Sequence, residues 1–332
     1  MRFQRIRGAL RIFRLAYVLS AVAITILILY PGLEISARLR FRGGQRLISR
    51  TFHRIMAALL GLRISIKGTP TSTRPLIVVA NHISWLDIIA ISSLLPAIFV
   101  TQHGVANWPI FGRLAKLSPS IFVNRDRRLE VAETINCISD ALTDGEVVVI
   151  FPEGTSSDGT NILPFRSALL GAVRETLRKA EYLHSIFIQP VSVAYVGPKR
   201  RLAAWAREDE IEFVPHLLQV AGLGQIDIAL TWEDPISANV SSDRKALSKQ
   251  LEQTVRRSVA EVQGQAGSAF SGPQDSHRLS ACCYGSAGLP TALENSIVAS
   301  LPERDVLTWR AAASDRAPRL RSHRPQISLW VL

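Results

Sequence analysis

Cysteine and methionine are scarce, because only three cysteines and two methionines occur among 332 residues. Cys282 and Cys283 are adjacent, Cys137 stands apart, and no C-x-x-C spacing occurs. The sequence therefore implies neither a disulfide framework nor a cysteine-based zinc site. We expect the functional machinery to face a reducing compartment or to be indifferent to redox conditions.

Acidic residues are also few relative to basic ones, since 27 Asp and Glu stand against 39 Lys and Arg and leave a formal net charge of +12. Such an excess suits an anionic partner, either nucleic acid or an anionic lipid surface. No recognised nucleic-acid-binding motif accompanies the arginines, and many of them flank one long apolar segment. We therefore expect membrane lipid as a partner and no nucleic acid.

That apolar segment covers residues 15–30, which include no charged residue, and it reaches Leu33 through Pro31 and Gly32. A spanning helix needs about 20 residues, so the length of this one is marginal. Arginines lie on both sides of the segment, so the positive-inside rule gives no clear orientation. A helix that crosses the membrane and one that dips into its cytoplasmic face both stay open. A cleaved signal peptide fits the basic start, but no A-x-A site follows the run.

Residues 45–62 carry apolar side chains at helical spacing, with Arg46, Arg50 and Arg54 in an i, i+4 row on another face. A basic amphipathic helix is typical of a membrane surface, whereas the alternative is an ordinary domain helix with a solvated face. Beside an apolar segment we favour the first interpretation. Residues 1–62 are therefore predicted to be a membrane anchor and a basic amphipathic helix. The expected location is a bacterial-type inner (cytoplasmic) membrane, with the active site on its cytoplasmic face.

From residue 63 to residue 262, apolar runs typical of strands alternate with segments of helical periodicity. This alternation predicts an α/β domain with a largely parallel sheet flanked by helices. Residues 263–332 show no sustained periodicity and are predicted to be a poorly ordered tail. Strands are expected at residues 63–68, 76–80, 97–101, 120–124, 146–151, 186–195 and 226–231. Helices are expected from residue 84 onward and at residues 127–142, 165–180 and 243–262.

The segment at residues 81–87 reads N-H-I-S-W-L-D and directly follows the strand predicted at residues 76–80. Asp87 is five positions after His82, so the two cannot share one helical face. We expect His82 in the turn and Asp87 in the first turn of the next helix. There Asp87 would accept the proton on Nδ1 of His82 and leave Nε2 to take a proton from an alcohol. The alternative is a capping box, in which Asp87 and Ser84 only cap the helix.

A second polar segment, P-E-G-T-S-S-D-G at residues 152–159, follows the strand predicted at residues 146–151. A carboxylate, a glycine and hydroxyl groups at the carboxyl end of a strand form a typical ligand-binding position in an α/β sheet. Taken alone, this segment is also compatible with an ordinary turn.

Together the two segments resemble the glycerolipid acyltransferase family, the PlsC-like group of lysophosphatidate acyltransferases. That family shows N-H-x-x-x-x-D, here from Asn81 and His82 to Asp87, followed by F-P-E-G-T-x-S, here residues 151–157. The resemblance implies that His82 is the general base and that Asp87 orients it.

Two further family motifs match, so that the resemblance covers roughly residues 1–260. Residues 119–125 follow G-x-x-F-x-x-R, with Pro119 in place of the glycine, and an apolar strand leads to proline at residues 186–190. By resemblance Arg125 would contact an anionic head group, for which a fixed guanidinium fork is suited. The strand at Pro190 would line the acyl pocket. The substrate-binding residues implied in this way are Asn81, Phe122, Arg125, Glu153, Gly154, Thr155 and Pro190.

The resemblance also implies the co-substrate, a fatty acyl thioester of acyl carrier protein or coenzyme A, with no metal and no other cofactor. The acceptor stays open, because Ser156 stands where many lysophosphatidate enzymes carry an arginine. Residues 151–170 also resemble bacterial enzymes that acylate lyso-ornithine lipid. The acceptor is therefore either lyso-ornithine lipid or 1-acyl-glycerol-3-phosphate. The competing functional class is a non-catalytic, membrane-associated lipid-binding module with the same fold.

Overall fold

The computed structural model describes residues 2–102, 120–123, 128–205 and 212–269, which fall within one of the two compact units of the chain. The other unit, residues 272–326, lies outside the described residues. Most of the predicted tail lies outside them as well, so its disorder stays a prediction.

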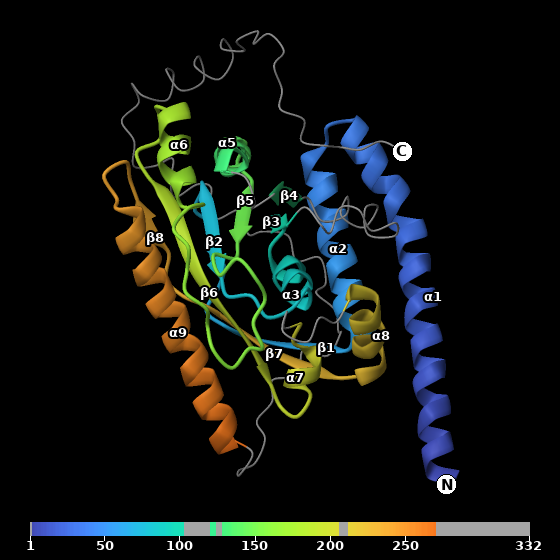
Figure 1. Cartoon of the computed structure of the whole chain (residues 1–332). Coiled ribbons are helices and arrows are strands. Elements are labelled where there is room, and N and C mark those ends of the chain that lie inside the picture. The colour runs from blue at the N-terminus through green and yellow to red at the C-terminus, as the bar shows by residue number, and fades with distance from the viewer. Residues whose placement is uncertain (1, 103–119, 124–127, 206–211, 270–332) are drawn as a thin grey trace, which may run out of the picture. The chain divides into compact units, whose positions relative to one another are not determined.

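One mixed sheet of eight strands runs through the described part of the chain, in the order β1-β7-β6-β2-β5-β3-β4, with β8 paired to β6 (Figure 1). Strands β6, β2, β5, β3 and β4 run parallel to one another, whereas β7 and β8 are antiparallel to β6. The predicted α/β class with a largely parallel sheet is confirmed. The strands are β1 Leu62–Lys67, β2 Leu76–Ala80, β3 Ile98–Gln102, β4 Ser120–Val123, β5 Val147–Ile150, β6 Ile186–Val196, β7 Ile226–Trp232 and β8 Ile236–Ala238.

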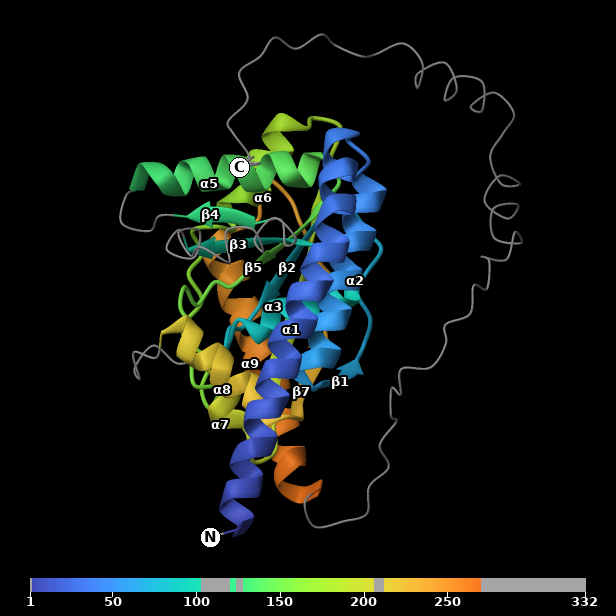
Figure 2. The ribbon, with the colours of Figure 1, turned by 90° about the vertical axis from the view of Figure 1, so that its right-hand side faces the viewer.

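Helices cover both faces of this sheet. Successive side chains of a strand point to opposite faces, so alternate residues of the central strands pack into two different cores. In β2, Val78 packs into a core with helices α1, α2 and α3, whereas Ile77 and Val79 pack into a second core with α5, α6 and α9. The helices themselves are labelled in Figures 1 and 2. Within the described ranges the helices are α1 Arg2–Arg38, α2 Arg42–Leu60, α3 Leu86–Leu94, α5 Arg128–Thr143, α6 Gly171–Lys179, α7 Arg200–Ala203, α8 Phe213–Leu223 and α9 Arg244–Ala269.

The carboxyl ends of β2 and β5 lie side by side, since these parallel strands pair from Leu76 opposite Val147 to Val79 opposite Ile150. The segment that follows β2, residues 81–87, is called the β2 turn below and includes the start of α3. The segment that follows β5, residues 151–163, is called the β5 turn. Both predicted site segments therefore leave the same edge of the sheet, where ligands bind in open α/β sheets.

Helix α1 contains the apolar segment: residues 12–38 are long and apolar enough to cross a membrane, judged by length and composition. Only 11% of its most apolar window is buried. One face packs against α2 through Val18 and Leu33, and Arg14 Nε donates to the carbonyl of Ala221 in α8 at 3.0 Å. The remaining faces expose large apolar side chains such as Phe13 and Leu27.

The arginine row of α2 contacts protein groups, while Arg46 and Arg54 stay exposed, and its place at a membrane surface stays a prediction. Arg46 forms an ion pair with Glu146 at 2.8 Å. Arg50 and Arg54 donate from Nε to the carbonyl of Ser93, at 3.4 and 3.1 Å. Ser93 lies near the end of α3, where cations are favourable for a helix. Periodicity gave the face of α2 correctly, but it could not show that the end of α3 lies opposite.

The helix predicted at residues 165–180 begins later, because α6 starts at Gly171. The backbone N–H of Phe165 donates to Glu252 at 2.9 Å, and the next N–H along the chain donates to Pro152 O at 2.9 Å. A helix leaves the N–H groups of its first turn without intrahelical acceptors, so these two hydrogen bonds hold the segment against other elements but do not explain its irregular backbone. Helices α7 and α8 and strand β8 were not predicted.

Candidate active site

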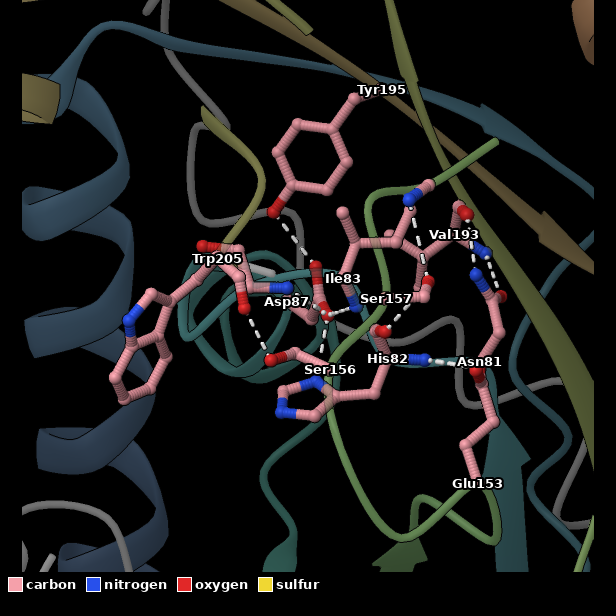
Figure 3. Close-up of polar contacts among 12 residues, drawn as sticks. Asn81, His82, Ile83, Asp87, Glu153, Ser156, Ser157, Val193, Tyr195 and Trp205 are labelled. Atoms are coloured by element: carbon pink, nitrogen blue, oxygen red, sulfur yellow. Dashed lines mark hydrogen bonds and ion pairs between the residues drawn. The ribbon is translucent and has the colours of Figure 1, made fainter. Parts of the chain in front are cut away.

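His82 and Asp87 meet in the β2 turn, with His82 Nδ1 2.9 Å from Asp87 Oδ2 (Figure 3). The Asp87 side chain is fully buried, whereas the His82 side chain is 19% exposed. The other ring nitrogen, Nε2, points away from Asp87 in Figure 3. The carboxylate can therefore fix Nδ1 as the protonated nitrogen and leave Nε2 as the one that accepts a proton.

Asp87 is itself held by three groups besides the imidazole. Its Oδ2 accepts the backbone N–H groups of Ile83 at 2.7 Å and Ser84 at 2.9 Å. Its Oδ1 accepts the hydroxyl of Tyr195 in β6 at 2.7 Å. Burial, together with the charge of Asp87, raises the pKa of Tyr195 well above its usual value, so that hydroxyl stays a donor. One carboxylate therefore accepts the N–H groups of the β2 turn and also contacts the histidine, whereas the Ser84 hydroxyl does not complete the predicted capping box.

The His82 ring is also held from one face. It stacks on Phe151 of the β5 turn, with ring centroids 4.2 Å apart and planes 22° apart. Phe151 packs in turn against Phe99 of β3, at 6.2 Å and 24°. Contact on one face and a hydrogen bond at Nδ1 leave the imidazole little freedom to rotate.

Glu153 of the β5 turn connects the two turns through their backbones. Its Oε1 accepts the N–H of His82 at 2.8 Å, and its Oε2 accepts the N–H of Leu163 at 3.0 Å. The residue is 3% exposed, and burial raises the pKa of its carboxyl to about 7, against the two N–H groups that lower it. Glu153 therefore lies next to His82, and both of its oxygens face backbone donors.

Further hydrogen bonds fix the backbone on either side of the His82 ring. The Asn81 side chain donates to Val193 O at 2.8 Å and accepts Val193 N–H at 2.7 Å, which fastens the end of β2 to β6. The carbonyl of His82 accepts the N–H of Ser157 at 2.8 Å and its hydroxyl at 3.2 Å. The β2 turn is thus joined to the sheet and to the β5 turn at consecutive residues.

The segment from α7 to α8 holds the opposite side of the β2 turn. The N–H of Trp205 donates to Ile83 O at 2.8 Å, and the hydroxyl of Ser156 donates to Trp205 O. Trp85 of the β2 turn donates from Nε1 to Nδ1 of His216 in α8 at 2.9 Å. Ser156 therefore joins the β5 turn to the α7–α8 segment.

The other predicted substrate-binding residues are placed as follows. Gly154 turns the chain with a φ of 81°, a conformation that favours glycine, and Thr155 follows it half-buried. Pro190 is buried within β6, opposite Val79, in a strand that continues to Val196. Phe122 lies in β4, where only the backbone is described, and Arg125 lies outside the described residues. Their substrate contacts, and the acyl-pocket role of Pro190, stay predictions.

Three residues that the sequence did not single out belong to this site: Tyr195, Trp205 and His216. For Tyr195 a signal existed, because a buried tyrosine hydroxyl in an apolar strand needs a partner. Nothing in the sequence indicated the partners of the other two. Among the residues that the structure describes, no group of three His, Cys, Asp or Glu side chains is placed to hold a metal ion.

Known proteins are similar to this chain in sequence and in fold. An Acyltransferase family model matches residues 63–194. Lyso-ornithine lipid O-acyltransferases from Rhizobium meliloti and Brucella abortus are each 35% identical, over 69% and 75% of this chain and 80% and 94% of the relatives. A 1-acyl-sn-glycerol-3-phosphate acyltransferase from Neisseria meningitidis is 27% identical over 62% of this chain and 78% of its own.

A solved structure supports the fold independently. PlsC from Thermotoga maritima, a 1-acyl-sn-glycerophosphate acyltransferase, superposes with a TM-score of 0.56 at 21% identity, over 77% of this chain and 98% of that one. The extent of the match to the enzymes from Rhizobium and Brucella sets aside a non-catalytic module. The chain belongs to the PlsC-like acyltransferase family and is an O-acyltransferase.

Proposed function

We propose that the protein transfers a fatty acyl group from a thioester, carried by acyl carrier protein or coenzyme A, to the free hydroxyl of a lysolipid. His82 is the general base and Asp87 orients it. The observation that carries this proposal is the 2.9 Å contact between His82 Nδ1 and a buried carboxylate, which leaves Nε2 directed away from it.

In the proposed reaction Nε2 of His82 removes the proton from the lysolipid hydroxyl as its oxygen attacks the thioester carbonyl carbon. An ester C–O bond forms, and the carbonyl oxygen becomes negative in the tetrahedral intermediate. The intermediate then collapses, the C–S bond breaks, and the leaving thiolate takes the proton from His82. Asp87 stabilises the imidazolium that exists between these two steps. No redox change, metal or further cofactor enters this scheme.

Lyso-ornithine lipid is the first acceptor to test. The names of the two relatives at 35% identity state that acceptor, whereas the glycerophosphate enzyme from Neisseria is 27% identical. Ser156 agrees with this choice, because its hydroxyl donates to the carbonyl of Trp205 and adds no positive charge for a phosphate. The second acceptor is 1-acyl-glycerol-3-phosphate.

The proposed setting is the inner membrane of a bacterium, with the site on the cytoplasmic face, where acyl thioesters are made. Helix α1 supports a membrane setting, because it is apolar over residues 12–38 and little buried. A lysolipid acceptor also resides in or near a bilayer. The arginines of α2 do not enter this argument, since they contact protein groups.

Replacement of the base tests the proposal. Membranes that contain His82→Ala should transfer labelled acyl groups from acyl carrier protein about 10² to 10⁴ times more slowly than wild type, the range for a lost general base. His184→Ala is the matched control, because His184 is an exposed histidine before β6 and should leave the rate unchanged. A near-wild-type rate for His82→Ala would refute the mechanism.

The acceptor is tested in the same assay by offering lyso-ornithine lipid and 1-acyl-glycerol-3-phosphate in parallel, each with acyl carrier protein and with coenzyme A thioesters. We expect label on lyso-ornithine lipid. Label on the glycerophosphate alone would overturn the choice of acceptor but keep acyl transfer, whereas label on neither would contradict the proposed function.

A further inference from the structure

Helix α8 supplies a buried histidine next to the β2 turn for which the proposed mechanism has no use. His216 is fully buried, and its Nδ1 accepts the indole N–H of Trp85 at 2.9 Å. An imidazole nitrogen that accepts a hydrogen bond carries no proton, so His216 is neutral here. Burial lowers the pKa of His216, which agrees with the neutral form.

Aromatic rings pack around the hydrogen bond between Trp85 and His216. The His216 ring lies 6.3 Å from the Trp85 ring at 87°, and 6.3 Å from the Trp205 ring at 15°. Phe213, one helical turn before His216, contacts both indoles, at 5.3 and 5.9 Å. The Trp85 side chain is therefore packed on two sides and hydrogen-bonded at its one polar atom.

Trp85 is placed so that its position affects the catalytic pair. It directly follows Ser84, whose N–H donates to Asp87, and it lies two residues before Asp87 itself. The N–H of Ile83 donates to the same carboxylate oxygen that contacts His82. A shift of the indole would move these donors and change the distance between Asp87 and His82.

Helix α8 is fixed at its carboxyl-terminal end as well, by hydrogen bonds from two basic side chains. Arg14 of α1 donates to Ala221 O at 3.0 Å, and Lys199 donates to Leu223 O. Positive charges at these carbonyls are favourable for the end of a helix. The helix is thus fixed at one end by α1 and contacts the β2 turn near the other.

We propose that His216 is a positioning residue for the acyl transfer: by accepting the Trp85 N–H it holds the β2 turn in the conformation that aligns Asp87 with His82. This role rests on the proposed function of His82 as the base. His216 itself touches no reacting atom.

A matched pair of substitutions tests this role. In His216→Asn the side-chain oxygen takes the place of Nδ1 and still accepts the indole N–H, whereas His216→Leu has a similar shape and no acceptor. We expect His216→Leu to lower kcat about tenfold, the rate equivalent of one lost hydrogen bond, with little change in KM for the acyl thioester. His216→Asn should recover most of that loss.

A second readout needs no substrate and separates this proposal from the proposed function. Amide hydrogen exchange of residues 82–87, measured on the full chain in membranes, should be faster in His216→Leu than in wild type and close to wild type in His216→Asn. Unchanged protection in His216→Leu would overturn the positioning role whether or not the protein acylates a lysolipid. Equal losses of protection and kcat in both variants would overturn it too, because they would indicate packing rather than the hydrogen bond.

Two controls isolate the contact. Gln219→Leu removes another α8 hydrogen bond, the one to Leu202 O at 3.0 Å, and should leave kcat and the protection of residues 82–87 unchanged. In a Trp85→Phe background the donor is gone, so His216→Leu should cause no further loss of kcat. Additive losses in the double variant would overturn the proposal.

Discussion

The β2 turn and the β5 turn each bury one carboxylate beside His82, and the two carboxylates have different partners. Asp87 accepts two backbone N–H groups, the imidazole and the Tyr195 hydroxyl. Glu153 accepts two backbone N–H groups and no side chain among its described hydrogen bonds. Both residues are almost inaccessible to solvent.

Burial alone would not distinguish the two carboxylates, but their partners do, because one contacts the His82 ring and the other contacts the His82 backbone. In the proposed mechanism Asp87 contacts the ring that exchanges a proton, so its charge can act on the reaction. Glu153 contacts the backbone N–H of His82, so it helps to determine where the histidine lies. The proposed mechanism therefore gives the orienting role to Asp87, which reaches the ring, and not to Glu153.

The substitution Asp87→Asn should cause the largest loss of activity, and it tests the difference between the two carboxylates most directly. The amide is almost isosteric with the carboxylate but offers no negative charge and only one acceptor atom, so it can no longer stabilise the imidazolium. We expect kcat to fall about 10² to 10⁴-fold, close to the effect of His82→Ala. In the double variant the two losses should not add, because both residues act in one step. A fall of less than about fivefold would contradict the role of Asp87.

The second prediction is that the carboxyl of Glu153 makes the free energy of unfolding depend on pH. Its carboxyl has a pKa raised from 4.5 to about 7 by burial, so between these values the folded protein holds a proton that the unfolded chain has lost. The unfolding free energy should therefore fall as the pH rises through this window, by about 3 kcal/mol, and level off above it.

Denaturant titrations of wild type and Glu153→Gln from pH 4 to pH 8 would measure this effect. Glutamine does not titrate, so the wild-type advantage in unfolding free energy should shrink with rising pH and stay constant above about pH 7. A pH-independent difference between the two proteins would contradict the raised pKa.

A smaller effect on catalysis is expected from the same Glu153→Gln change at neutral pH. The amide accepts with one oxygen only, so either the His82 N–H or the Leu163 N–H loses its acceptor. We expect kcat to fall about tenfold, because the base becomes less well placed while its chemistry is intact. A loss as large as that of Asp87→Asn would remove the distinction between the two carboxylates.

The smallest effect is expected from Tyr195→Phe, which removes a partner that Asp87 has and Glu153 lacks. The hydrogen bond from this hydroxyl to Asp87 is replaced by apolar contact, while the imidazole and both N–H groups remain. Loss of one hydrogen bond of four predicts a fall in kcat of about five- to tenfold. Steady-state rates with saturating lysolipid would show it, and an unchanged rate would mean that the other three contacts suffice.

Much of this fold could be predicted because its signals are local. The apolar runs at β2 and β5 indicate buried strands, and alternating strands and helices indicate an α/β sheet. The five-residue spacing of His82 and Asp87 correctly predicted a turn followed by the start of a helix. The resemblance to a family then connected two motifs that neither spacing nor periodicity could join.

The rest depended on contacts between distant parts of the chain. The sequence could not show that Arg50 and Arg54 of α2 donate to the carbonyl of Ser93 near the end of α3. It also could not show that α6 begins only at Gly171, or that the N–H of Phe165 donates to Glu252. His216 belongs to a helix that was not predicted, so its contact with Trp85 had no signal in the sequence.

The distances along the sequence between the residues of the site predict the order in which the site assembles. His82 and Asp87 are five positions apart, but Tyr195 reaches Asp87 across 108 positions and His216 reaches Trp85 across 131. A growing chain that has emerged only to the end of the β5 turn therefore has both motifs and lacks β6 and α8. Because distant contacts form only after the loop between them closes, we expect the histidine to become a competent base late in folding. If His82 is the base, as proposed, we expect the nascent enzyme to be inactive until most of its sheet is in place.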